Sequence, residues 1–282
     1  MSKVVLITGC STGIGRDLAM QLANSGYTVV ATARKVETMD DLKVALKLPL
    51  DVTQEDSINR AVEQAIQRFG RIDVLVNNAG YALRGAIEEV PVDQVQKMFD
   101  VNVFGVMRMI QAVIPHMRQQ KAGRIINISS ISGKLVTPAN GAYSATKFAL
   151  EALSDALRLE LAPFGIPVVL VEPGSIKTQF HTTVESNAQE IFSDPGSPYQ
   201  PLYQQYERVT ADMRRKEPGP DAVSKVVQQA IEADKPNDRY LVAFPLSGRL
   251  VIHLGDPAWD LVVRQLFKIP RIVVSNYERG VR

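Results

Sequence analysis

A tyrosine and a lysine stand four positions apart in the stretch "YSATK", at Tyr143 and Lys147. Residues at i and i+4 share one face of a helix, so the phenol and the ammonium would be neighbours there. A phenol is a poor base near neutral pH because its reference pKa is about 10, and a nearby ammonium lowers this pKa by stabilising the phenolate. The spacing therefore favours a proton-transfer pair, although a core aromatic beside a surface lysine has the same spacing.

The elements that must position this pair follow from hydrophobic periodicity. Runs rich in Val, Ile and Leu predict seven strands, at 3–8, 28–33, 46–52, 72–77, 124–129, 167–172 and 239–244. Segments with helical spacing separate them. Strands that are apolar on both faces and alternate with helices indicate a parallel sheet covered on both sides. We therefore expect one doubly wound α/β domain over residues 1–282, with a seven-stranded parallel sheet in a three-layer α/β/α arrangement.

Composition and charge exclude several kinds of function. Of the 282 residues, 45% are hydrophobic and 22% charged, as in a globular protein with one large core. A net charge of only +2, without long basic runs, argues against nucleic acid as a partner. The three histidines, His116, His181 and His253, lie far apart with no acidic or sulfur neighbours at ligand spacing. We therefore expect no metal site.

The single cysteine and the N-terminal sequence bear on the compartment. Cys10 cannot form an intramolecular disulfide, and "MSKVVLITGC" lacks the basic and then apolar layout of a signal peptide. No stretch approaches the roughly 20 apolar residues that a membrane span needs. A cytoplasmic protein without an integral membrane span is the expectation.

The first predicted strand runs directly into a glycine-rich loop, "TGCSTGIG", and then into a helix. Gly9, Gly13 and Gly15 allow the backbone to turn sharply and to approach a ligand closely. The helix that follows offers free N–H groups and the positive end of its dipole to a pyrophosphate. The loop predicts a dinucleotide site, against the simpler interpretation of a tight strand-to-helix turn.

The end of the second strand indicates which dinucleotide would bind. An NAD site usually has Asp or Glu there for the ribose hydroxyls, whereas a 2′-phosphate needs a cation in place of that acid. Here the strand ends "ATARK", with Arg34 and Lys35 and no acid until Glu37. Because a guanidinium binds phosphate with two parallel hydrogen bonds, the sequence favours NADP(H). Two solvated surface cations are the alternative.

Two C-terminal segments depart from the strand and helix alternation. Within residues 178–219, Pro195, Gly196, Pro198 and Pro201 break any long period, and five aromatics are interspersed. Such a long loop is often a lid over a substrate. The extension, about residues 245–282, contains an amphipathic helix with Trp259, Val262, Val263 and Leu266 on one face. That face would pack on the body or on a partner subunit, or lie on a membrane surface.

Six motifs occur in the order and approximate spacing of the single-domain short-chain dehydrogenases/reductases, which the chain resembles over about residues 3–178. They are "TGCSTGIG", "NNAG", "DVNVFG", "INISSISG", "YSATK" and "EPGSIKT". Longer phrases such as "YSATKFALEALSDALRLELAPFGI" resemble the 17β-hydroxysteroid dehydrogenase and retinol dehydrogenase-like branch. The resemblance implies a Rossmann fold and a homodimer or homotetramer formed through helices near 92–119 and 143–162.

The resemblance also implies roles for four residues. Tyr143 would be the acid and base, and Lys147 would bind the nicotinamide ribose as well as tune the tyrosine. Ser130, thirteen residues before the tyrosine, would hold the substrate oxygen, with Ser129 as a competing candidate. Asn102 would hold a water in a proton relay to the lysine. Taken singly, Ser130 is equally a strand-end turn and Asn102 a helix cap.

Cofactor contacts carry over by motif in the same way. The residues implied are Gly9, Ser11, Gly13, Ile14 and Gly15 at the pyrophosphate and its sugar; Arg34 at the 2′-phosphate; Asp51 and Val52 at the adenine; Asn78, Ala79 and Gly80 at the adenosine side; Tyr143 and Lys147 at the nicotinamide ribose; and Pro173, Gly174, Ile176 and Thr178 at the carboxamide. Each has a structural alternative, for example a helix cap at Asp51, a turn at "NNAG" or a loop at Pro173 and Gly174.

Together these features predict an NADP(H)-dependent oxidoreductase that interconverts an alcohol and its ketone or aldehyde. The lid aromatics and the branch favour a bulky hydrophobic substrate of steroid, retinoid or lipid-ketone type. A small-carbonyl reductase of broad specificity and a dinucleotide-binding regulator without turnover are the alternatives. An epimerase of the longer type also uses a tyrosine and a lysine, but it normally has a larger C-terminal domain and a different glycine spacing.

Overall fold

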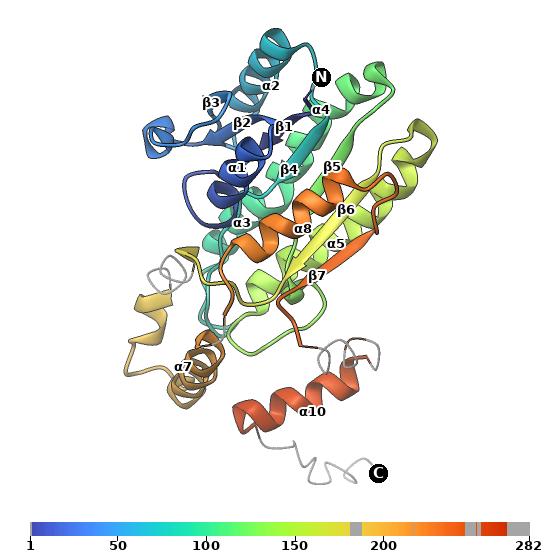
Figure 1. Cartoon of the computed structure of the whole chain (residues 1–282). Coiled ribbons are helices and arrows are strands. Elements are labelled where there is room, and N and C mark those ends of the chain that lie inside the picture. Colours follow the sequence, from blue (N-terminus) through green and yellow to red (C-terminus); the bar gives the residue numbers. More distant parts are fainter. Residues whose placement is uncertain (1, 181–187, 216, 246–251, 253–254, 270–282) are drawn as a thin grey trace, which may run out of the picture.

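Seven short strands form the centre of the molecule, and all but the two edge strands are buried along most of their length. They are β1 (Val4–Ile7), β2 (Thr28–Ala33), β3 (Leu46–Pro49), β4 (Val74–Asn77), β5 (Arg124–Ile128), β6 (Val168–Pro173) and β7 (Arg239–Val242). The computed structural model describes all residues except 1, 181–187, 216, 246–251, 253–254 and 270–282. All seven strands pair in parallel in the order β3-β2-β1-β4-β5-β6-β7 (Figure 1). The predicted strands and parallel sheet are confirmed.

Alternate residues of each strand supply two separate cores, one on each face of the sheet. On one face Val5 and Ile7 pack with α1 (Gly13–Asn24) and α8 (Asp221–Glu232). On the other face Val4 and Leu6 pack with α2 (Glu55–Phe69), α4 (Gly105–Gln120) and α5 (Gly141–Leu161). The helices have the apolar stripes that these faces require. The three-layer α/β/α arrangement is therefore as predicted.

The helical run Val92–Gln120 is interrupted at the motif "DVNVFG". It consists of α3 (Val92–Phe99), a single π-helical turn η2 (Asp100–Phe104) and α4. Among the described residues this run alone is long and apolar enough to cross a membrane, and 39% of its most apolar window is buried. The expectation that no segment approaches such a length is wrong for this run, because core residues such as Met109, Val113 and Met117 give it the same apolar composition.

The predicted lid segment is more regular than its prolines and glycines indicate. Residues 188–192 are helical, and α7 spans Gln200–Arg214. The expectation of a structureless loop is wrong here because Pro201 lies in the first turn of α7, where the missing N–H has no helical partner to lose. Residues 181–187 of this segment lie outside the described residues.

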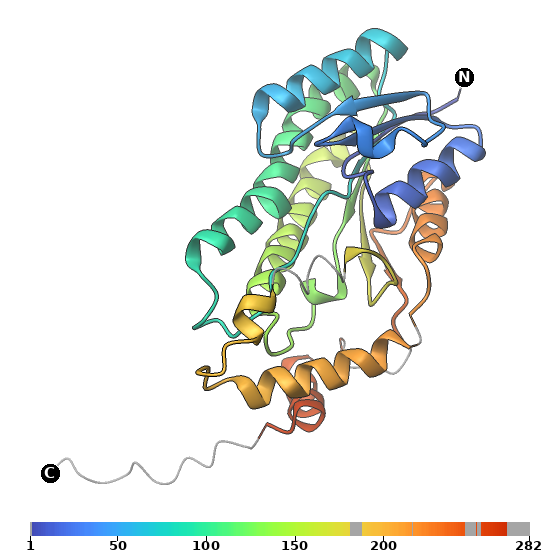
Figure 2. The same cartoon turned by 90° about the vertical axis from the view of Figure 1, so that its left-hand side faces the viewer.

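The described part of the C-terminal extension packs against this segment. Helix α10 (Asp256–Phe267) lies beside α7 beyond the carboxyl ends of the strands (Figure 2). The Tyr206 and Phe267 rings are 6.3 Å apart between centroids, and Gln205 Nε2 donates to the Leu266 carbonyl at 2.8 Å. Trp259 Nε1 donates to the Val136 carbonyl at 2.6 Å. The amphipathic helix therefore packs on the body of the chain, which is one of the arrangements expected from the sequence.

Candidate functional site

The sequence motifs meet at one edge of the sheet. The glycine loop follows β1, "NNAG" overlaps and follows β4, Ser130 follows β5, and Pro173 ends β6. These strands are neighbours in the sheet and parallel, so their carboxyl ends face the same side. Crevices at this edge of open α/β sheets are where ligands bind. The fold thus gathers predicted residues that lie as many as 165 positions apart, from Gly9 to Gly174.

Two glycines of the loop are required by its geometry. Gly9 has a φ of +76°, and a Cβ there would lie 2.9 Å from the Cα of Ala79. A Cβ on Gly15 would meet Asn78 Nδ2 at 2.3 Å and the Gly9 carbonyl oxygen at 2.4 Å. Side chains at either position would force the loop away from the "NNAG" turn, so the glycines are more than a flexible connection. The remaining N–H groups at the start of α1 suit an anionic pyrophosphate.

The "NNAG" turn supports the glycine loop directly. Asn78 Nδ2 donates to the carbonyls of Thr8 and Gly9 at 2.9 and 3.1 Å. The backbone N–H groups of Asn78 and Ala79 both donate to Thr8 Oγ1 at 3.0 Å. These bonds hold the ends of β1 and β4 together. In the structure Asn78 and Ala79 are thus part of the framework that shapes the predicted dinucleotide site.

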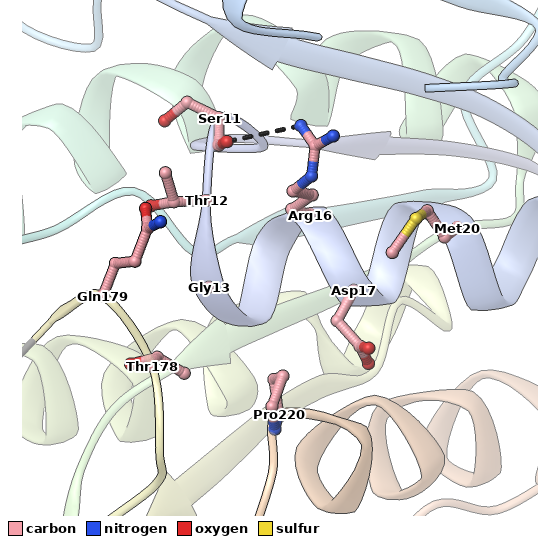
Figure 3. Close-up of a pocket in the computed structure, with 9 residues that line it drawn as sticks. All are labelled: Ser11, Thr12, Gly13, Arg16, Asp17, Met20, Thr178, Gln179 and Pro220. Carbon is pink, nitrogen blue, oxygen red and sulfur yellow. Dashed lines mark hydrogen bonds between the residues drawn. The ribbon is translucent and has the colours of Figure 1, made fainter. Parts of the chain in front are cut away.

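A cavity of about 510 Å³ opens beside the glycine loop (Figure 3). Of the predicted cofactor residues, Ser11, Gly13 and Thr178 line it. Sequence reasoning missed its other lining residues, which are Thr12, Arg16, Asp17, Met20, Gln179 and Pro220. Tyr143 is not among the lining residues, so this cavity lies beside the predicted dinucleotide path and away from the predicted proton-transfer pair. The only sequence signal for Arg16 was its position directly after the glycine motif.

Two arginines near the predicted adenosine end, Arg16 and Arg34, differ in whether they have partners in the described structure. Arg16 is ion-paired with Asp41 and donates to the Thr38 carbonyl at 3.1 Å. Arg34 is exposed and makes no hydrogen bond or ion pair with any residue that the structure describes. Its charge reaches Tyr81, where it opposes the burial that raises the pKa of that phenol. Arg34 is therefore available to an anion in a way that Arg16 is not.

Asp51 and Val52 make local contacts in the structure. Asp51 Oδ1 accepts from the Thr53 N–H at 2.9 Å and from Thr53 Oγ1 at 2.8 Å. Helix α2 begins at Glu55 with Gln54 as its N-cap, so Asp51 is not the cap that its alternative interpretation proposed. Val52 is buried against Gly105, where a Cβ would meet Val52 Cγ2 at 2.8 Å. Both residues therefore fix the turn that precedes α2.

The motif "EPGSIKT", which is predicted to hold the carboxamide, turns sharply at the end of β6. The Gly174 N–H donates to the Val242 carbonyl at 2.8 Å, and a Cβ on Gly174 would meet the Ala243 carbonyl oxygen at 2.5 Å. Ile176 is buried beneath this turn, next to Pro173 at the strand end. Ile14 packs partly buried on the same core. Thr178 lies opposite Gly13, and a Cβ added to Gly13 would be 3.5 Å from the Thr178 Cβ.

Tyr143 lies near the start of α5 with its ring 7% exposed. It packs among Ala82, Leu83, Val90 and Met98, and its ring centroid is 6.1 Å from that of Phe180 in the predicted lid. The alternative of a core aromatic is thus correct about burial. Hydrogen bonding with the Ser130 side chain nevertheless gives the phenol a polar partner. Ser129 is different, because its hydroxyl is buried and finds no partner among the described residues.

The pKa values of the pair differ from the sequence expectation. Burial raises the pKa of the Tyr143 phenol above its usual value, and the Arg84 charge and the Ser130 hydrogen bond oppose this only in part. Lys147 is buried too: burial lowers its pKa to about 8, against the opposing charge of Glu151. The lowering expected from the sequence relies on the lysine charge together with the positive nicotinamide ring of the oxidised cofactor. For the protein's own groups, desolvation of the phenolate is the larger effect.

Lys147 is held by the backbone beside Tyr143. Its Nζ donates to the Ile128 carbonyl at 2.9 Å and lies 5.8 Å from the centroid of the Tyr143 ring. The chain continues from the end of β5 to Ser130. The backbone N–H of Ser132 donates to Ser130 Oγ at 3.1 Å. The end of β5 therefore positions both the ammonium and the hydroxyl next to the phenol. This is the neighbourhood that the i and i+4 spacing predicted.

Asn102 sits in the π-helical turn and is 1% exposed. Its Nδ2 donates to the Tyr81 carbonyl at 2.8 Å and to Thr146 Oγ1 at 3.1 Å, and its Oδ1 accepts from the Tyr81 N–H at 3.1 Å. It is therefore not a helix cap. The side chain ties the chain after "NNAG" to α5, one residue before Lys147. Turns of π-helix are frequent at functional sites, and a Cβ on Gly80 would crowd the Asn102 amide at 3.1 Å.

Sequence reasoning missed one cation next to the tyrosine. The Cζ of Arg84 lies 5.3 Å from the centroid of the Tyr143 ring. The only sequence signal was a lone basic residue in the apolar stretch "YALRGAI". Among the described residues no group of three or more His, Cys, Asp or Glu side chains is placed to hold a metal ion. The arrangement of Tyr143, Ser130 and Lys147 suits proton transfer to and from an oxygen.

Comparison with known proteins identifies the family. The model of the short chain dehydrogenase family matches residues 3–189. Human 17-beta-hydroxysteroid dehydrogenase type 1 is 36% identical over 270 residues, which cover 90% of this chain and 82% of that protein. A 3-ketodihydrosphingosine reductase of Bacteroides thetaiotaomicron is 45% identical over 178 residues, 63% of this chain and 65% of that reductase.

Solved structures agree with this assignment. A short-chain dehydrogenase from Streptomyces avermitilis superposes with a TM-score of 0.73 at 33% identity, covering 95% of this chain and 96% of that one. ElxO with NADP bound superposes with a TM-score of 0.70 at 30% identity, covering 86% and 96%. With these relatives, a seven-stranded Rossmann-type sheet and a site that fits a nicotinamide dinucleotide, the chain is an oxidoreductase of the short-chain dehydrogenase family.

Proposed function

We propose that the protein is an NADP(H)-dependent oxidoreductase that interconverts a secondary or primary alcohol and its ketone or aldehyde. The observation that carries this proposal is the convergence of Tyr143, Ser130 and Lys147 at the end of β5, beside the dinucleotide site. A bound nicotinamide supplies or accepts the hydride. The protein's own residues must then bind the substrate oxygen and move its proton.

Tyr143 is the residue we propose for the proton step. In reduction its phenol donates a proton to the substrate oxygen; in oxidation the phenolate removes it from the alcohol. The Ser130 hydroxyl hydrogen-bonds the same oxygen and the phenol, which holds the two in line. Lys147, whose Nζ is 5.8 Å from the centroid of the phenol ring, would add charge there and bind the ribose. Asn102 links the loop after β4 to α5. A relay through water at Asn102 stays part of this proposal.

The preference for NADP(H) rests on Arg34. This exposed arginine has no acid beside it at the end of β2 and no described partner, and one arginine binds a phosphate with two hydrogen bonds. Similar solved structures hold NADP or 5-hydroxy-NADP. The remaining cofactor roles of Gly9, Ser11, Gly13, Gly15 and their partner motifs are proposed as the sequence predicts them.

The cofactor proposal is tested by comparing kcat/KM for NADPH and NADH in wild type, Arg34→Ala and Arg60→Ala. Arg60 is a matched control because it is exposed on α2. We expect a wild-type preference for NADPH that falls about 10- to 100-fold in Arg34→Ala and does not change in Arg60→Ala. A wild-type preference for NADH that Arg34→Ala leaves unchanged would contradict the proposal.

For the substrate we propose a bulky hydrophobic alcohol or carbonyl compound. The support is the apolar cluster around Tyr143, the aromatics of residues 178–219 and the names of the two relatives, a sphingoid-ketone reductase and a hydroxysteroid dehydrogenase. Turnover of nicotinamide at 340 nm with a panel of steroid, retinoid, long-chain and small carbonyl compounds tests it. A higher kcat/KM for the small carbonyls would instead indicate a small-carbonyl reductase, and tight cofactor binding without any turnover would indicate a regulator.

We also propose a homo-oligomer in the reducing cytoplasm. Phe104, Phe148 and Leu159 are exposed by 49%, 44% and 68% on η2 and α5, where the family surfaces for assembly are expected. The lone Cys10 is buried, and burial raises the pKa of its thiol to about 12, which keeps it an unreactive thiol. Light scattering of wild type and Phe148→Glu tests assembly; a monomeric wild type contradicts it. A fluorescent fusion tests the location.

A further inference from the structure

Arg84 occupies a fixed place in the chain that follows β4. On its C-terminal side the Gly85 N–H donates to the Ala139 carbonyl at 3.0 Å, and the Ala86 N–H donates to the Tyr203 hydroxyl at 3.0 Å. A Cβ on Gly85 would meet Val90 Cγ2 at 2.7 Å, so the turn is tightly packed. The backbone that carries Arg84 is therefore tied both to the loop before α5 and to helix α7.

The guanidinium lies between two aromatic rings. Its Cζ is 5.3 Å from the centroid of the Tyr143 ring and 6.0 Å from that of the Tyr206 ring. Cation–π contacts at these distances hold a guanidinium in place without using its N–H groups. The positive charge thus stands at the junction of the proposed proton donor and the predicted lid.

Two of the three guanidinium nitrogens of this arginine lack a hydrogen-bond partner among the described residues. Both Nε and Nη1 are buried and make no hydrogen bond with any residue that the structure describes. The nearest acids in sequence are engaged elsewhere: Glu88 accepts from the Tyr199 hydroxyl at 2.6 Å, and both oxygens of Glu89 accept from Ser197 and Tyr203. Buried charged donors that have no partner destabilise the folded protein. A ligand with matching acceptors would remove this cost.

We propose that Arg84 is a specificity-determining residue that binds a carboxylate of the substrate. This inference rests on the proposed function and narrows it: the substrate is an apolar oxo or hydroxy carboxylic acid. A carboxylate matches the planar fork of a guanidinium and balances its single charge. The apolar part of the substrate would lie against the aromatics Phe180, Phe192, Tyr199 and Tyr206, which belong to the apolar clusters around Tyr143 and Tyr203.

A different role for Arg84 makes a different prediction. Its charge lowers the pKa of the Tyr143 phenol against the effect of burial. If tuning of the tyrosine were its only role, loss of the charge would slow acidic and neutral substrates equally and would shift the pH profile for both. Recognition of a carboxylate makes the loss selective for the acid.

The first test compares 4-oxodecanoate with its methyl ester, with NADPH, in wild type, Arg84→Met and Arg84→Lys. We expect wild type to prefer the acid at least about tenfold in kcat/KM, and Arg84→Met to lose at least about tenfold more of its kcat/KM on the acid than on the ester. Arg84→Lys, which keeps the charge but not the fork, should lie between them. Equal losses on acid and ester, or no loss on the acid, would overturn the inference.

A second test needs no turnover and so separates this inference from the proposed function. Calorimetric titration measures binding of decanoate and decanamide to the NADPH complex of wild type and of the same two variants. We expect decanoate affinity to fall about tenfold or more in Arg84→Met while decanamide affinity is unchanged. Failure of wild type to bind decanoate more tightly than decanamide overturns the carboxylate assignment, whereas absence of turnover with every carbonyl compound counts against the proposed function alone. Arg84→Lys keeps the test valid if Arg84→Met does not fold.

Discussion

The glycine loop and the region around Arg84 lie at the same edge of the sheet but are built in different ways. In the loop, backbone groups and absent side chains make the site: Gly9 and Gly15 let two turns touch, and Asn78 bonds to backbone carbonyls. Around Arg84, long side chains from α5, α7 and the chain after β4 make the site. A backbone site recognises a constant ligand such as a pyrophosphate, whereas a side-chain site can change with the substrate.

The largest effect is expected at Tyr143, whose ring lies against Arg84. Tyr143→Phe removes the proposed proton donor and should lower kcat about 10³-fold, while NADPH affinity stays within about twofold. Cofactor titration and turnover with the best substrate of the panel measure the two quantities. Tyr27→Phe is the control, since Tyr27 lies on the surface and its hydroxyl bonds to Glu232. Retention of most activity in Tyr143→Phe would show that the proton comes from elsewhere.

The next largest effect is expected in the glycine loop. Gly15→Ala puts a Cβ against Asn78 Nδ2 and the Gly9 carbonyl, and an overpacked site of this kind loses about 1–3 kcal/mol. NADPH affinity should therefore fall about 10- to 100-fold. Gly196→Ala is a control on the lid side, where the nearest atom is the movable carboxylate of Asp194 at 3.3 Å. Equal NADPH affinity in wild type and Gly15→Ala would mean that the loop tolerates the shift.

A change in the predicted lid should affect substrate binding and leave cofactor binding unchanged, which is the opposite of the effect expected in the glycine loop. Tyr203→Phe removes a hydroxyl that donates to Glu89 and accepts from the Ala86 N–H, at a cost of about 1–2 kcal/mol. We expect KM for a bulky substrate to rise about tenfold with NADPH affinity unchanged. The exposed Glu190→Gln in the same segment is the control. A loss of NADPH affinity in Tyr203→Phe would show that the two regions are coupled.

The smallest effect is expected for the buried acid pair Glu151 and Glu172. Burial and the neighbouring charge of Glu151 raise the pKa of Glu172 to about 7, against Lys134 and Arg239. Because the folded protein then holds this proton to a higher pH than the unfolded chain, stability should fall as pH rises from about 4.5 to 7 and level off above 7.

Urea unfolding of wild type and Glu172→Gln across this pH range measures the effect. The variant should lack the decline, which we expect to be on the order of 1 kcal/mol. Asp155→Asn is the comparison, because Arg239 and Arg158 hold the pKa of Asp155 below its usual value although burial opposes them. Its stabilising effect should be lost only as pH falls through that low pKa. Parallel curves for wild type and Glu172→Gln would contradict the assignment.

Local pattern was enough for the sheet, the order of its strands along the chain and the glycine loop. These features depend on periodicity and on backbone freedom, which a sequence displays directly. The helical content of residues 188–215 was missed because Pro201 reads as a helix breaker unless its position in the first turn is known. The sign of the pKa shift at Tyr143 was missed for a different reason, since burial of a phenol depends on what packs over it.

The sequence by itself determined the family, the seven-stranded parallel architecture and the residues that could transfer a proton, because these rest on motifs and spacing along one chain. Only the tertiary structure decided which partner each residue has. Ser130 rather than Ser129 faces the phenol, Asn102 links two segments through Tyr81 and Thr146, and Arg84 lies against Tyr143 with unpaired N–H groups. Contacts between positions tens of residues apart arise when strand ends converge at one edge of a sheet, and spacing along the chain carries no direct record of them.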